Sequence, residues 1–334
     1  MQFDKPLLSV LVPAYNVEKY IGACIRSLLR QTYPAIEILI CDDASSDNTW
    51  EKANEFSDDR LHAFRNSNNL GKNQTSDFLL KHCKGDYVTI HDADDFSSPD
   101  RFENQISFLV KNPEYAMCGS NYISFLNNGK VIARSNLSID DAVIREQIKR
   151  QSQFHGPTIV IKKSVIADVG GLYRFFKRAE DIDLTMRVTE KFKVCNLPGY
   201  YYYYRHQPFS LTNDVKGYSI ERLAHFKLLY YLAEERASNH GIDTLMLGDM
   251  NRLNRLVSEF KKEYEHDPEI ALRRGAFRLL YMRLYSNAVK VAWVAMVDKP
   301  NIINLKCLVY TLIHYVKGKI KLIRTMERVD PGLL

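Results

Sequence analysis

The stretch Val88-Thr89-Ile90-His91-Asp92-Ala93-Asp94-Asp95 places three carboxylates within four residues, directly after a short apolar run. The apolar residues predict a buried strand that ends at the carboxylates. Like charges a few ångströms apart repel, so this cluster is costly unless something positive lies on it. Mg²⁺ or Mn²⁺ suits hard oxygen ligands, and Mg²⁺ is commonly held by one or two carboxylates plus phosphate oxygens. Alone, the stretch is equally compatible with an acidic turn at a helix N-terminus.

Composition places the chain among globular proteins. Of 334 residues, 46% are hydrophobic and 26% are charged, which suits one large domain or a domain with an extension. Residues 1–6 show no signal-peptide pattern, and no run of about 18 apolar residues predicts a membrane-spanning helix. The six cysteines are scattered without a Cys-x-x-Cys pair, which predicts buried free thiols and no structural zinc. We therefore predict a cytoplasmic protein.

Positive charge is concentrated near the C-terminus. Residues 271–334 contain twelve Lys or Arg against three acidic residues, a net of +9. Since the whole chain nets +6, residues 1–270 net −3. This asymmetry predicts an anionic partner surface for the C-terminal region and says nothing of the remainder.

Strands and helices alternate in the first third of the chain. Apolar runs predict strands at 7–12, 36–41, 60–65 and 86–91, and helical spacing predicts helices at 17–31, 46–56, 71–83 and 99–111. This alternation predicts a parallel, doubly wound α/β sheet. Ligands of such sheets bind at the carboxyl ends of strands. We therefore expect Asn16, Asp42-Asp43 and the acidic stretch to converge.

The later pattern changes twice. Strands are predicted over 115–135 with a hairpin turn at Asn127-Asn128-Gly129, then at 156–161 and 199–205, with a helix over 180–191. Beyond about 216 the pattern is helical. The predicted organisation is a catalytic domain over 1–216 and a basic, amphipathic helical extension over 217–334.

Five ordered segments together resemble the family 2 glycosyltransferases of the GT-A fold, over roughly residues 7–212. The resemblance implies a doubly wound mixed α/β sheet, a nucleotide-sugar donor, Mn²⁺ or Mg²⁺, and inversion at the anomeric carbon in bacterial surface-polysaccharide synthesis. The segments that carry it are Ser9–Asn16, Ser27–Tyr33, Glu37–Thr49, Lys84–Tyr87 with Asp92–Asp95, and Ala179–Leu184.

The resemblance also implies donor-binding residues. The tyrosine of the first loop is expected to stack on the base, and the first Asp after the second strand to accept a hydrogen bond from a uracil N–H. Many relatives carry Ala-Arg-Asn in the helix before the acidic strand, whereas here Ser76 and Asp77 replace the Arg-Asn pair, so Lys72 becomes the candidate phosphate-facing cation. Arg205 begins a pattern with Ser210, Leu211 and Thr212 that resembles a loop closing on the donor. The full expected donor set is Pro13, Tyr15, Asn16, Asp42, Asp43, Lys72, Asp92, Ala93 and Arg205.

Metal and catalytic roles follow from the same resemblance. Asp94 is expected to ligate the metal directly, and Asp92 to meet the ribose or the metal's waters. Asp95 is either a second ligand or the cap of the helix that Pro99 opens. His206 either completes the metal shell or is a surface residue. A metal so placed would stabilise charge on the leaving nucleotide.

Asp181 falls where the family places its catalytic base. An acceptor hydroxyl must lose its proton as it attacks opposite the leaving group, so one carboxylate must lie there. Glu180 and Asp183 compete for that role, and helix N-termini attract acids in any case. Glu180 and His155 are assigned to the acceptor side, although His155 has an equally good structural interpretation.

The predicted activity is a metal-dependent, inverting transfer of a hexosyl or N-acetylhexosaminyl group, most simply from a UDP-sugar, to a hydroxyl of a glycan or lipid-linked saccharide. Processive relatives carry a Gln-x-x-Arg-Trp motif, and this chain has none. The resemblance therefore implies addition of one or a few sugars per encounter. The alternatives are a sugar-phosphate nucleotidylyltransferase, which should show a Gly-rich basic loop where Pro13–Asn16 stands, and a non-catalytic glycan-binding relative.

Residues 277–297 and 305–324 mix aliphatic and aromatic residues with Lys and Arg. Such basic amphipathic helices suit an anionic membrane surface, which predicts a peripheral protein at the inner face of a membrane. The competing interpretation is a helical bundle packed on the catalytic domain or against a second subunit, so a homodimer stays open. Nucleic acid is not an expected partner.

Overall fold

The computed structural model describes residues 5–176, 179–206, 219–281, 284–323 and 328–329. Contacts divide the chain into two compact units, each described here by itself. The predicted boundary near residue 216 falls outside the described residues. The first unit comprises Met1–Ser124, Arg134–Arg205 and Asp330–Leu334, and the second comprises Phe125–Ala133 and His206–Val329.

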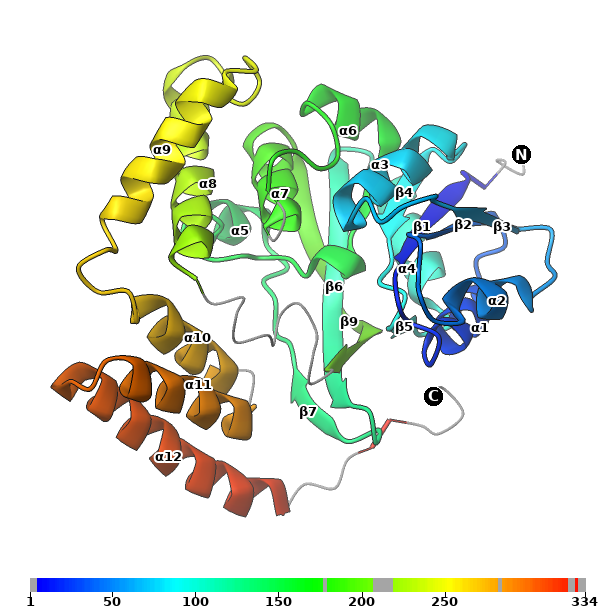
Figure 1. Cartoon of the computed structure of the whole chain (residues 1–334). Helices are drawn as coiled ribbons and strands as arrows, with labels where there is room; N and C mark the ends of the chain where they lie inside the picture. The colour runs from blue at the N-terminus through cyan, green and yellow to red at the C-terminus, as the bar shows by residue number, and fades with distance from the viewer. Residues whose placement is uncertain (1–4, 177–178, 207–218, 282–283, 324–327, 330–334) are drawn as a thin grey trace. The chain divides into compact units, whose positions relative to one another are not determined.

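A mixed sheet, nine-stranded in the residues that the structure describes, dominates the first unit, and its strand β7 lies mostly in the second (Figure 1). Along the sheet the order is β3-β2-β1-β4-β8-β6-β9-β5, with β7 paired to β6. The strands are β1 (Leu8–Ala14), β2 (Ile36–Asp42), β3 (Leu61–Arg65), β4 (Tyr87–Ile90), β5 (Phe96–Ser97), β6 (Tyr115–Leu126), β7 (Val131–Arg134), β8 (Val160–Lys162) and β9 (Lys193–His206).

Only the first half of the sheet is parallel. Strands β3, β2, β1 and β4 run parallel, as the alternating pattern predicts. The β4–β8, β8–β6 and β5–β9 pairs are antiparallel. The expectation of an all-parallel sheet is therefore wrong beyond β4, while the mixed sheet that the resemblance implied is confirmed. The parallel strands are joined by helices over Ile21–Leu29, Thr49–Asn54 and Lys72–His82, which carry the chain back so that the next strand runs in the same direction. The tight turn at Gly129, with φ 79°, reverses the chain only from β6 into β7.

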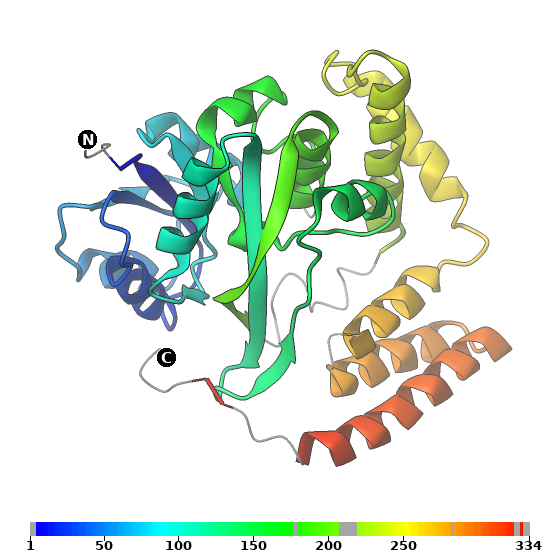
Figure 2. The same ribbon diagram turned by 180° about the vertical axis from the view of Figure 1, so that it is seen from behind.

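Helices cover both faces of this sheet (Figures 1 and 2). On one face, alternate residues of β1 (Leu8, Val10 and Val12) pack against α1 and α4 in one buried cluster. On the other face, α3 contacts β1 and β2. Each such apolar side chain contributes about 1.5–3 kcal/mol when fully buried. The helices are α1 (Ile21–Leu29), α2 (Thr49–Asn54), α3 (Lys72–His82), α4 (Arg101–Lys111), α5 (Asp141–Gln147), α6 (Lys163–Asp168) and α7 (Glu180–Lys191).

Several sequence-based boundaries need correction. Residues 156–158 form a 3₁₀ turn, and the strand predicted over 156–161 begins only at Val160, because Pro157 lies at the start of that turn. The tyrosine strand predicted over 199–205 begins at Lys193. Two short helices, α5 and α6, were not predicted. All six cysteines are buried and free, as expected.

The second unit is helical. Helix α8 (Ile220–Ser238) packs with α9 (Met250–Lys262), and α10 (Ile270–Tyr281), α11 (Tyr285–Asp298) and α12 (Ile302–Ile323) pack together. A small core of Ala276, Leu279, Val291, Ala292 and Leu308 joins the last three helices. Among the described residues, no helix is both long and apolar enough to cross a membrane.

Candidate active site

The loops that follow β1 and β2 are interlocked. Asn16 and Ala44 have left-handed backbones, with φ 51° and 56°. The Asn16 N–H donates to Ser45 Oγ at 2.9 Å, and the Asn16 side-chain oxygen accepts from the Ser46 N–H at 2.9 Å. The two strand ends thus converge as the topology predicts, and Asn16 uses its side chain to join them. Its expected donor contact stays a prediction.

The two aspartates that follow β2 have different surroundings. Asp42 is 1% exposed and forms an ion pair with Arg65 Nε at 3.0 Å. Asp43 accepts hydrogen bonds from the N–H groups of Leu70 and Gly71 at 2.9 and 2.8 Å. Asp43 therefore fixes the loop that leads into α3, a structural role that competes with the predicted donor contact.

Tyr15 and Pro13 flank this corner. Pro13 is partly buried within β1, opposite Cys41 of β2. The Tyr15 side chain follows the strand and is 48% exposed. A tyrosine ring so exposed is available to stack on a planar group such as a nucleobase.

An ion pair joins α3 to the acidic turn Asp92–Asp95. The Lys72 ammonium lies 2.7 Å from Asp92 Oδ1, and Lys72 is the first residue of α3. Burial lowers the pKa of Lys72, but the negative charges around it, led by Asp92, outweigh burial and hold that pKa well above its usual range. Burial likewise raises the pKa of Asp92, and Lys72 outweighs it, so the pKa of Asp92 is lowered. The positive charge that the acidic turn requires is therefore supplied in part by the protein.

Asp95 fastens the acidic turn to β9. Its Oδ1 accepts from the Arg205 backbone N–H at 2.6 Å, and Arg205 Nε donates to the Asp94 carbonyl at 2.8 Å. Burial, together with the charges of Asp94 and Asp92, raises the pKa of Asp95 well above its usual range. The cap of α4 is Asp100 rather than Asp95, so that alternative for Asp95 is wrong. Ala93 is 4% exposed inside the turn.

Two buried basic residues support the turn from beneath. His91 meets the Asp92 carbonyl through Nδ1 at 2.9 Å and Ser97 Oγ through Nε2 at 3.0 Å. Burial and the Arg101 charge lower the pKa of His91 to about 3, so this imidazole is neutral. Arg101 is fully buried and donates to Ser97 Oγ at 2.9 Å and to the Pro157 carbonyl at 2.7 Å.

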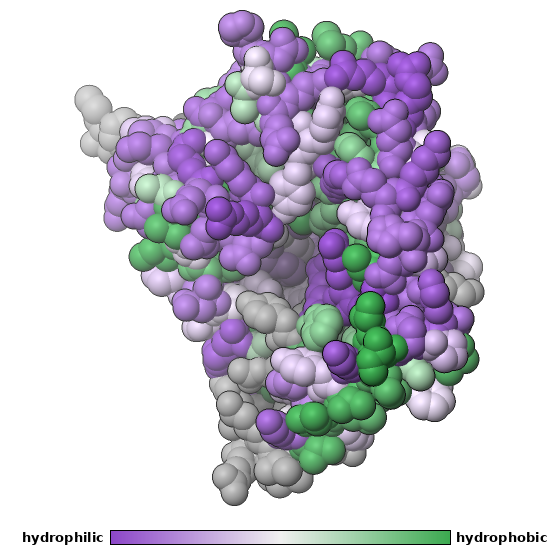
Figure 3. Space-filling model, turned by 90° about the vertical axis from the view of Figure 1, so that its left-hand side faces the viewer, coloured by the Kyte–Doolittle hydropathy of each residue, from purple (hydrophilic) through white to green (hydrophobic). Residues whose placement is uncertain are grey.

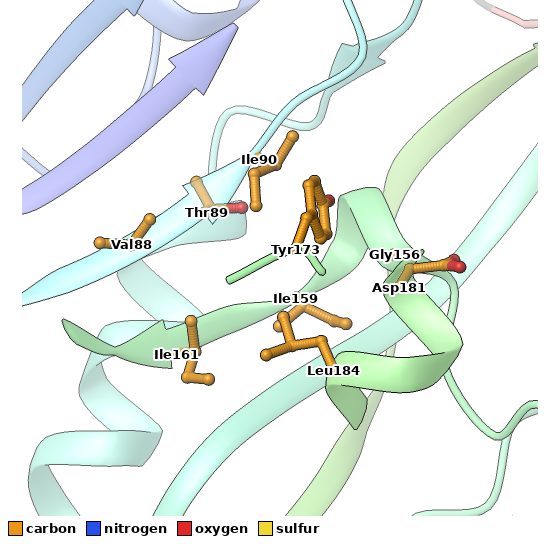
Figure 4. Close-up of a pocket in the computed structure, with 9 residues that line it drawn as sticks. All are labelled: Val88, Thr89, Ile90, Gly156, Ile159, Ile161, Tyr173, Asp181 and Leu184. Atoms are coloured by element: carbon orange, nitrogen blue, oxygen red, sulfur yellow. The ribbon is translucent and has the colours of Figure 1, made fainter. Parts of the chain in front are cut away.

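Asp181 lies in the first turn of α7, directly against Gly156 (Figure 4). A Cβ atom on Gly156 would fall 2.8 Å from both Cβ and Oδ2 of Asp181. Beneath them is a cavity of about 10 Å³ lined mainly by apolar side chains of β4 and β8, which holds at most one water molecule. In Figure 4 the Asp181 carboxylate points away from these apolar side chains.

Gly156 and Tyr173 also lie at this site, although the sequence did not predict them as site residues. Tyr173 lines the same cavity as Asp181. Burial raises the pKa of Tyr173, which also lies within electrostatic reach of Lys72, Glu180 and Asp92. Tyr173 therefore links the acidic turn to the start of α7. The Gly-Pro pair at 156–157 is a sequence signal for a turn, whereas the prediction places it at the start of a strand over 156–161.

The two acidic neighbours of Asp181, Asp183 and Glu180, have different surroundings. Asp183 is buried and paired with Arg174 and with Arg187, whose Nε lies 2.9 Å from Asp183 Oδ2. Both oxygens of Asp183 are thus engaged, which removes it as a competing base. Burial and the adjacent Asp181 charge raise the pKa of Glu180 to about 7.

The two histidines occupy different places. His155 stacks on Tyr122 with ring centroids 4.2 Å apart and meets Tyr204 edge-on at 4.9 Å. His155 also lies within electrostatic reach of Asp92. His206 is the last residue of β9 and falls in the second unit. Its burial lowers its pKa to about 4, which excludes a surface residue and leaves the metal role as a prediction. Ser210, Leu211 and Thr212 lie outside the described residues.

The acidic turn fits a divalent ion held jointly with a diphosphate. Within the described ranges, no three His, Cys, Asp or Glu side chains converge into a complete metal cage. An ion that keeps waters and phosphate oxygens needs only one or two carboxylates, and Asp94 and Asp92 are the ones expected to hold it. Burial is the main cause of the raised pKa of Asp95, and the charges of Asp94 and Asp92 add to it. A cation at this turn would offset that negative charge.

Substituting Glu180 by Gln tests the electrostatics of this site. A carboxyl whose folded pKa is raised from 4.5 to about 7 contributes stability below pH 4.5 that is lost as pH rises through 7. Between pH 5 and 8 we expect the free energy of unfolding of the wild type to fall by up to about 3 kcal/mol relative to that of Glu180→Gln. Urea unfolding at each pH measures it. Glu190→Gln, on the exposed side of α7, is the matched control. Parallel wild-type and Glu180→Gln curves would contradict the assignment.

Comparison with known proteins agrees with this geometry. A family model described as Glycosyl transferase family 2 matches residues 9–179. EpsE of Bacillus subtilis (strain 168), provisionally named as a glycosyltransferase, is 32% identical over 222 residues, covering 65% of this chain and 79% of EpsE. The Escherichia coli protein WfgD, named as a UDP-Glc:alpha-D-GlcNAc-diphosphoundecaprenol beta-1,3-glucosyltransferase, is 39% identical over 131 residues, which are 39% of this chain and 51% of WfgD.

Solved structures show the same fold. Residues 1–349 of S. aureus TarS, in complex with UDP-GlcNAc, superpose with a TM-score of 0.59 at 18% identity, covering 95% of this chain and 90% of that one. The mannosyltransferase PcManGT from Pyrobaculum calidifontis, in complex with GDP-Man and Mn²⁺, gives a TM-score of 0.52 at 15% identity, covering 96% and 88%. With the family match over β1 to the start of α7, these findings confirm the expected fold and class: the chain belongs to glycosyl transferase family 2 and is a glycosyltransferase of the GT-A fold.

Proposed function

We propose that this chain transfers one sugar per encounter, with inversion, from a UDP-sugar to a hydroxyl of a lipid-linked or glycan acceptor, using Mn²⁺ or Mg²⁺. The observation that carries the proposal is the closeness of two groups that the chemistry must bring together. Lys72 pairs with Asp92, and Glu180 lies within electrostatic reach of both. Ile90, the last residue of β4, and Asp181 line the same small cavity. A donor diphosphate at the first group leaves the sugar near the second.

The donor assignment draws on this chain and on relatives. Asp42, at the end of β2, can accept a hydrogen bond from a uracil N–H once its contact with Arg65 allows, and the exposed Tyr15 ring can stack on the base. WfgD is named for UDP-Glc and a diphosphoundecaprenol-linked acceptor, and TarS was solved with UDP-GlcNAc. These names support a UDP-sugar and a lipid-linked saccharide.

The residues around the diphosphate have separate tasks. Lys72 can turn from Asp92 to a phosphate oxygen, because its side chain is 33% exposed. Asp94 and Asp92 would hold the divalent ion, which supplies Lewis-acid stabilisation of the leaving nucleotide. Arg205 keeps the acidic turn in position by donating its backbone N–H to Asp95 and its Nε to the Asp94 carbonyl.

Asp181 is the proposed base. It lies in the first turn of α7. That helix is anchored because Asp183 pairs with Arg174, and because Arg187 donates to the carbonyl groups of Val169 and Leu172. A carboxylate there accepts the proton of the acceptor hydroxyl during attack. Glu180, with its raised pKa, is assigned to the acceptor side beside it. His155, stacked on Tyr122, extends this side with aromatic surface.

We also propose that α11 and α12 bind an anionic membrane. Eight apolar side chains of α12 are exposed, together with Trp293 and Val297 of α11, and Figure 3 shows apolar side chains gathered low on this face of the molecule. The exposed face is wider than the narrow stripe of a two-stranded coiled coil. Lys306 and Lys317 lie among these side chains, which favours anionic lipid over a second protein. The α12 residues are Ile302, Ile303, Leu305, Val309, Tyr310, Leu312, Ile313 and Val316.

Nucleotide release from UDP-, GDP- and dTDP-sugars with Mn²⁺ tests the activity. We expect metal-dependent release from a UDP-sugar, reduced at least about 100-fold in Asp94→Ala because the diphosphate loses a charged anchor. Asp181→Asn should bind the donor normally yet lose about 10²–10⁴-fold in transfer to an acceptor. Asp59→Asn, exposed and remote from the acidic turn, is the control. Absence of metal-dependent release and of binding for every donor would refute the proposal.

Gly156→Ala tests the placement of Asp181. The new Cβ would push the Asp181 side chain aside, and a displacement of about 1 Å costs about 100-fold in rate. We expect transfer to fall by that order while donor affinity, measured by calorimetry, stays the same. Gly22→Ala is the control, because the added Cβ would meet only the movable guanidinium of Arg26, at 3.3 Å. Equal activity of the two variants would show that transfer does not depend on the space that Gly156 leaves for the Asp181 side chain.

The double variant Val309→Glu with Ile313→Glu tests the membrane proposal. Two charges on the exposed face of α12 should reduce co-sedimentation with anionic vesicles roughly tenfold or more, because apolar burial is lost and anionic lipid repels carboxylates. Val110→Glu is the matched control, since Val110 lies on the exposed side of α4 and is 51% exposed. Unchanged sedimentation of the double variant would contradict the proposal. A wild-type dimer that the same variant dissociates would instead assign this face to a second copy.

A further inference from the structure

A basic pocket lies in the second unit, where the start of α8 meets α10. The pocket has a volume of about 80 Å³. One water molecule needs about 10–15 Å³, so the pocket holds several waters or one small anion. Three arginines line it, Arg222 from the first turn of α8 and Arg274 and Arg278 from successive turns of α10. Among the lining residues that the structure describes, none is a carboxylate.

Several other arginines of the same unit are paired with carboxylates. Arg236 is paired with Asp243, Arg273 with Asp267 and Arg252 with Glu235. In the part of the chain that the structure describes, neither Arg274 nor Arg278 lies in an ion pair. Guanidinium groups stay charged at any physiological pH. Two such charges beside a cavity whose described lining has no acid give a positive potential that an anion would neutralise.

The N-terminus of α8 adds to this potential. Helix α8 is 19 residues long, and its cap Ser219 also lines the pocket. The Ser219 side chain accepts a hydrogen bond from the Arg222 N–H at 3.2 Å. A helix N-terminus carries about half a positive charge and favours anions, phosphate groups above all. Cavity, arginines and helix end therefore point to the same ligand chemistry.

We propose that this pocket binds a phosphate or diphosphate group, either on a lipid head group or free in solution. Arginine forks suit phosphate oxygens because two parallel N–H groups can donate to one phosphate. The pocket also adjoins apolar surface. Phe277, between the two arginines in the α10 sequence, meets Tyr310 of α12 with ring centroids 5.5 Å apart, and the two side chains are 46% and 47% exposed. A phosphate carried by a lipid would thus find apolar contacts close by.

The experiment compares Arg274→Ala/Arg278→Ala with Lys290→Ala/Lys299→Ala in the full chain. Both pairs of residues are exposed, and both changes remove two positive charges from the same basic region. One arm titrates inorganic pyrophosphate by calorimetry. The other measures binding to phosphatidylcholine vesicles with and without an anionic phospholipid. Thermal unfolding and release of nucleotide from the donor sugar confirm that each variant is folded, and they separate this proposal from the transferase assignment.

The proposal expects the arginine variant to lose tenfold or more in affinity for a phosphate probe while the lysine variant keeps most of it. Loss of pyrophosphate binding assigns the pocket to free phosphates, and loss of anionic-vesicle binding alone assigns it to lipid head groups. Equal losses in both double variants would mean that only net charge matters and would overturn the proposal. So would a wild-type protein that binds neither probe, or an arginine variant that binds both as wild type does.

Discussion

The ion pair between Lys72 and Asp92 is the interaction on which the rest of this site depends. Three carboxylates at the end of β4 repel one another. Burial raises the pKa of Asp95, and the charges of Asp94 and Asp92 raise it further. Lys72 offsets part of it, and Asp43 holds the loop that places Lys72 there. The same lysine is the cation that we propose to meet a donor phosphate. The protein thus neutralises only part of the acidic turn by itself, and in that proposal Lys72 exchanges the Asp92 carboxylate for a phosphate oxygen.

Much of the fold was predictable because its signals are local. Buried apolar runs marked β1, β2 and β4, and the carboxylates after β4 announced the site. The antiparallel half of the sheet was harder to predict, since β5 has only two residues and β8 three. Strands so short carry no periodic pattern. The 3₁₀ turn at 156–158 was mistaken for a strand for the same reason.

The parts of the site that escaped prediction depend on long-range packing. Nothing in the local sequence shows that Gly156 lies against Asp181, or that Asp183 forms ion pairs with Arg174 and Arg187. Asp181 and Asp183 are two residues apart in one acidic run, yet only Asp183 is buried between arginines. Motif position singled out Asp181, and tertiary structure supplies the physical reason why its neighbour is a worse candidate. Asn16 and Asp43 show the reverse case, because side chains expected to face a ligand also hold the loops.

The hydrogen bond from Arg205 to Asp95 has a consequence for biosynthesis. It joins residues 110 positions apart, whereas the parallel strands β1 to β4 need only the first 90 residues. During translation at about 5–20 residues per second, the acidic turn must wait on the order of ten seconds for the strand that secures it. The growing chain can therefore form its nucleotide-side sheet early, while the finished acidic turn arises only after β9 has left the ribosome. A truncated product ending before β9 would carry the motif without a fastened site.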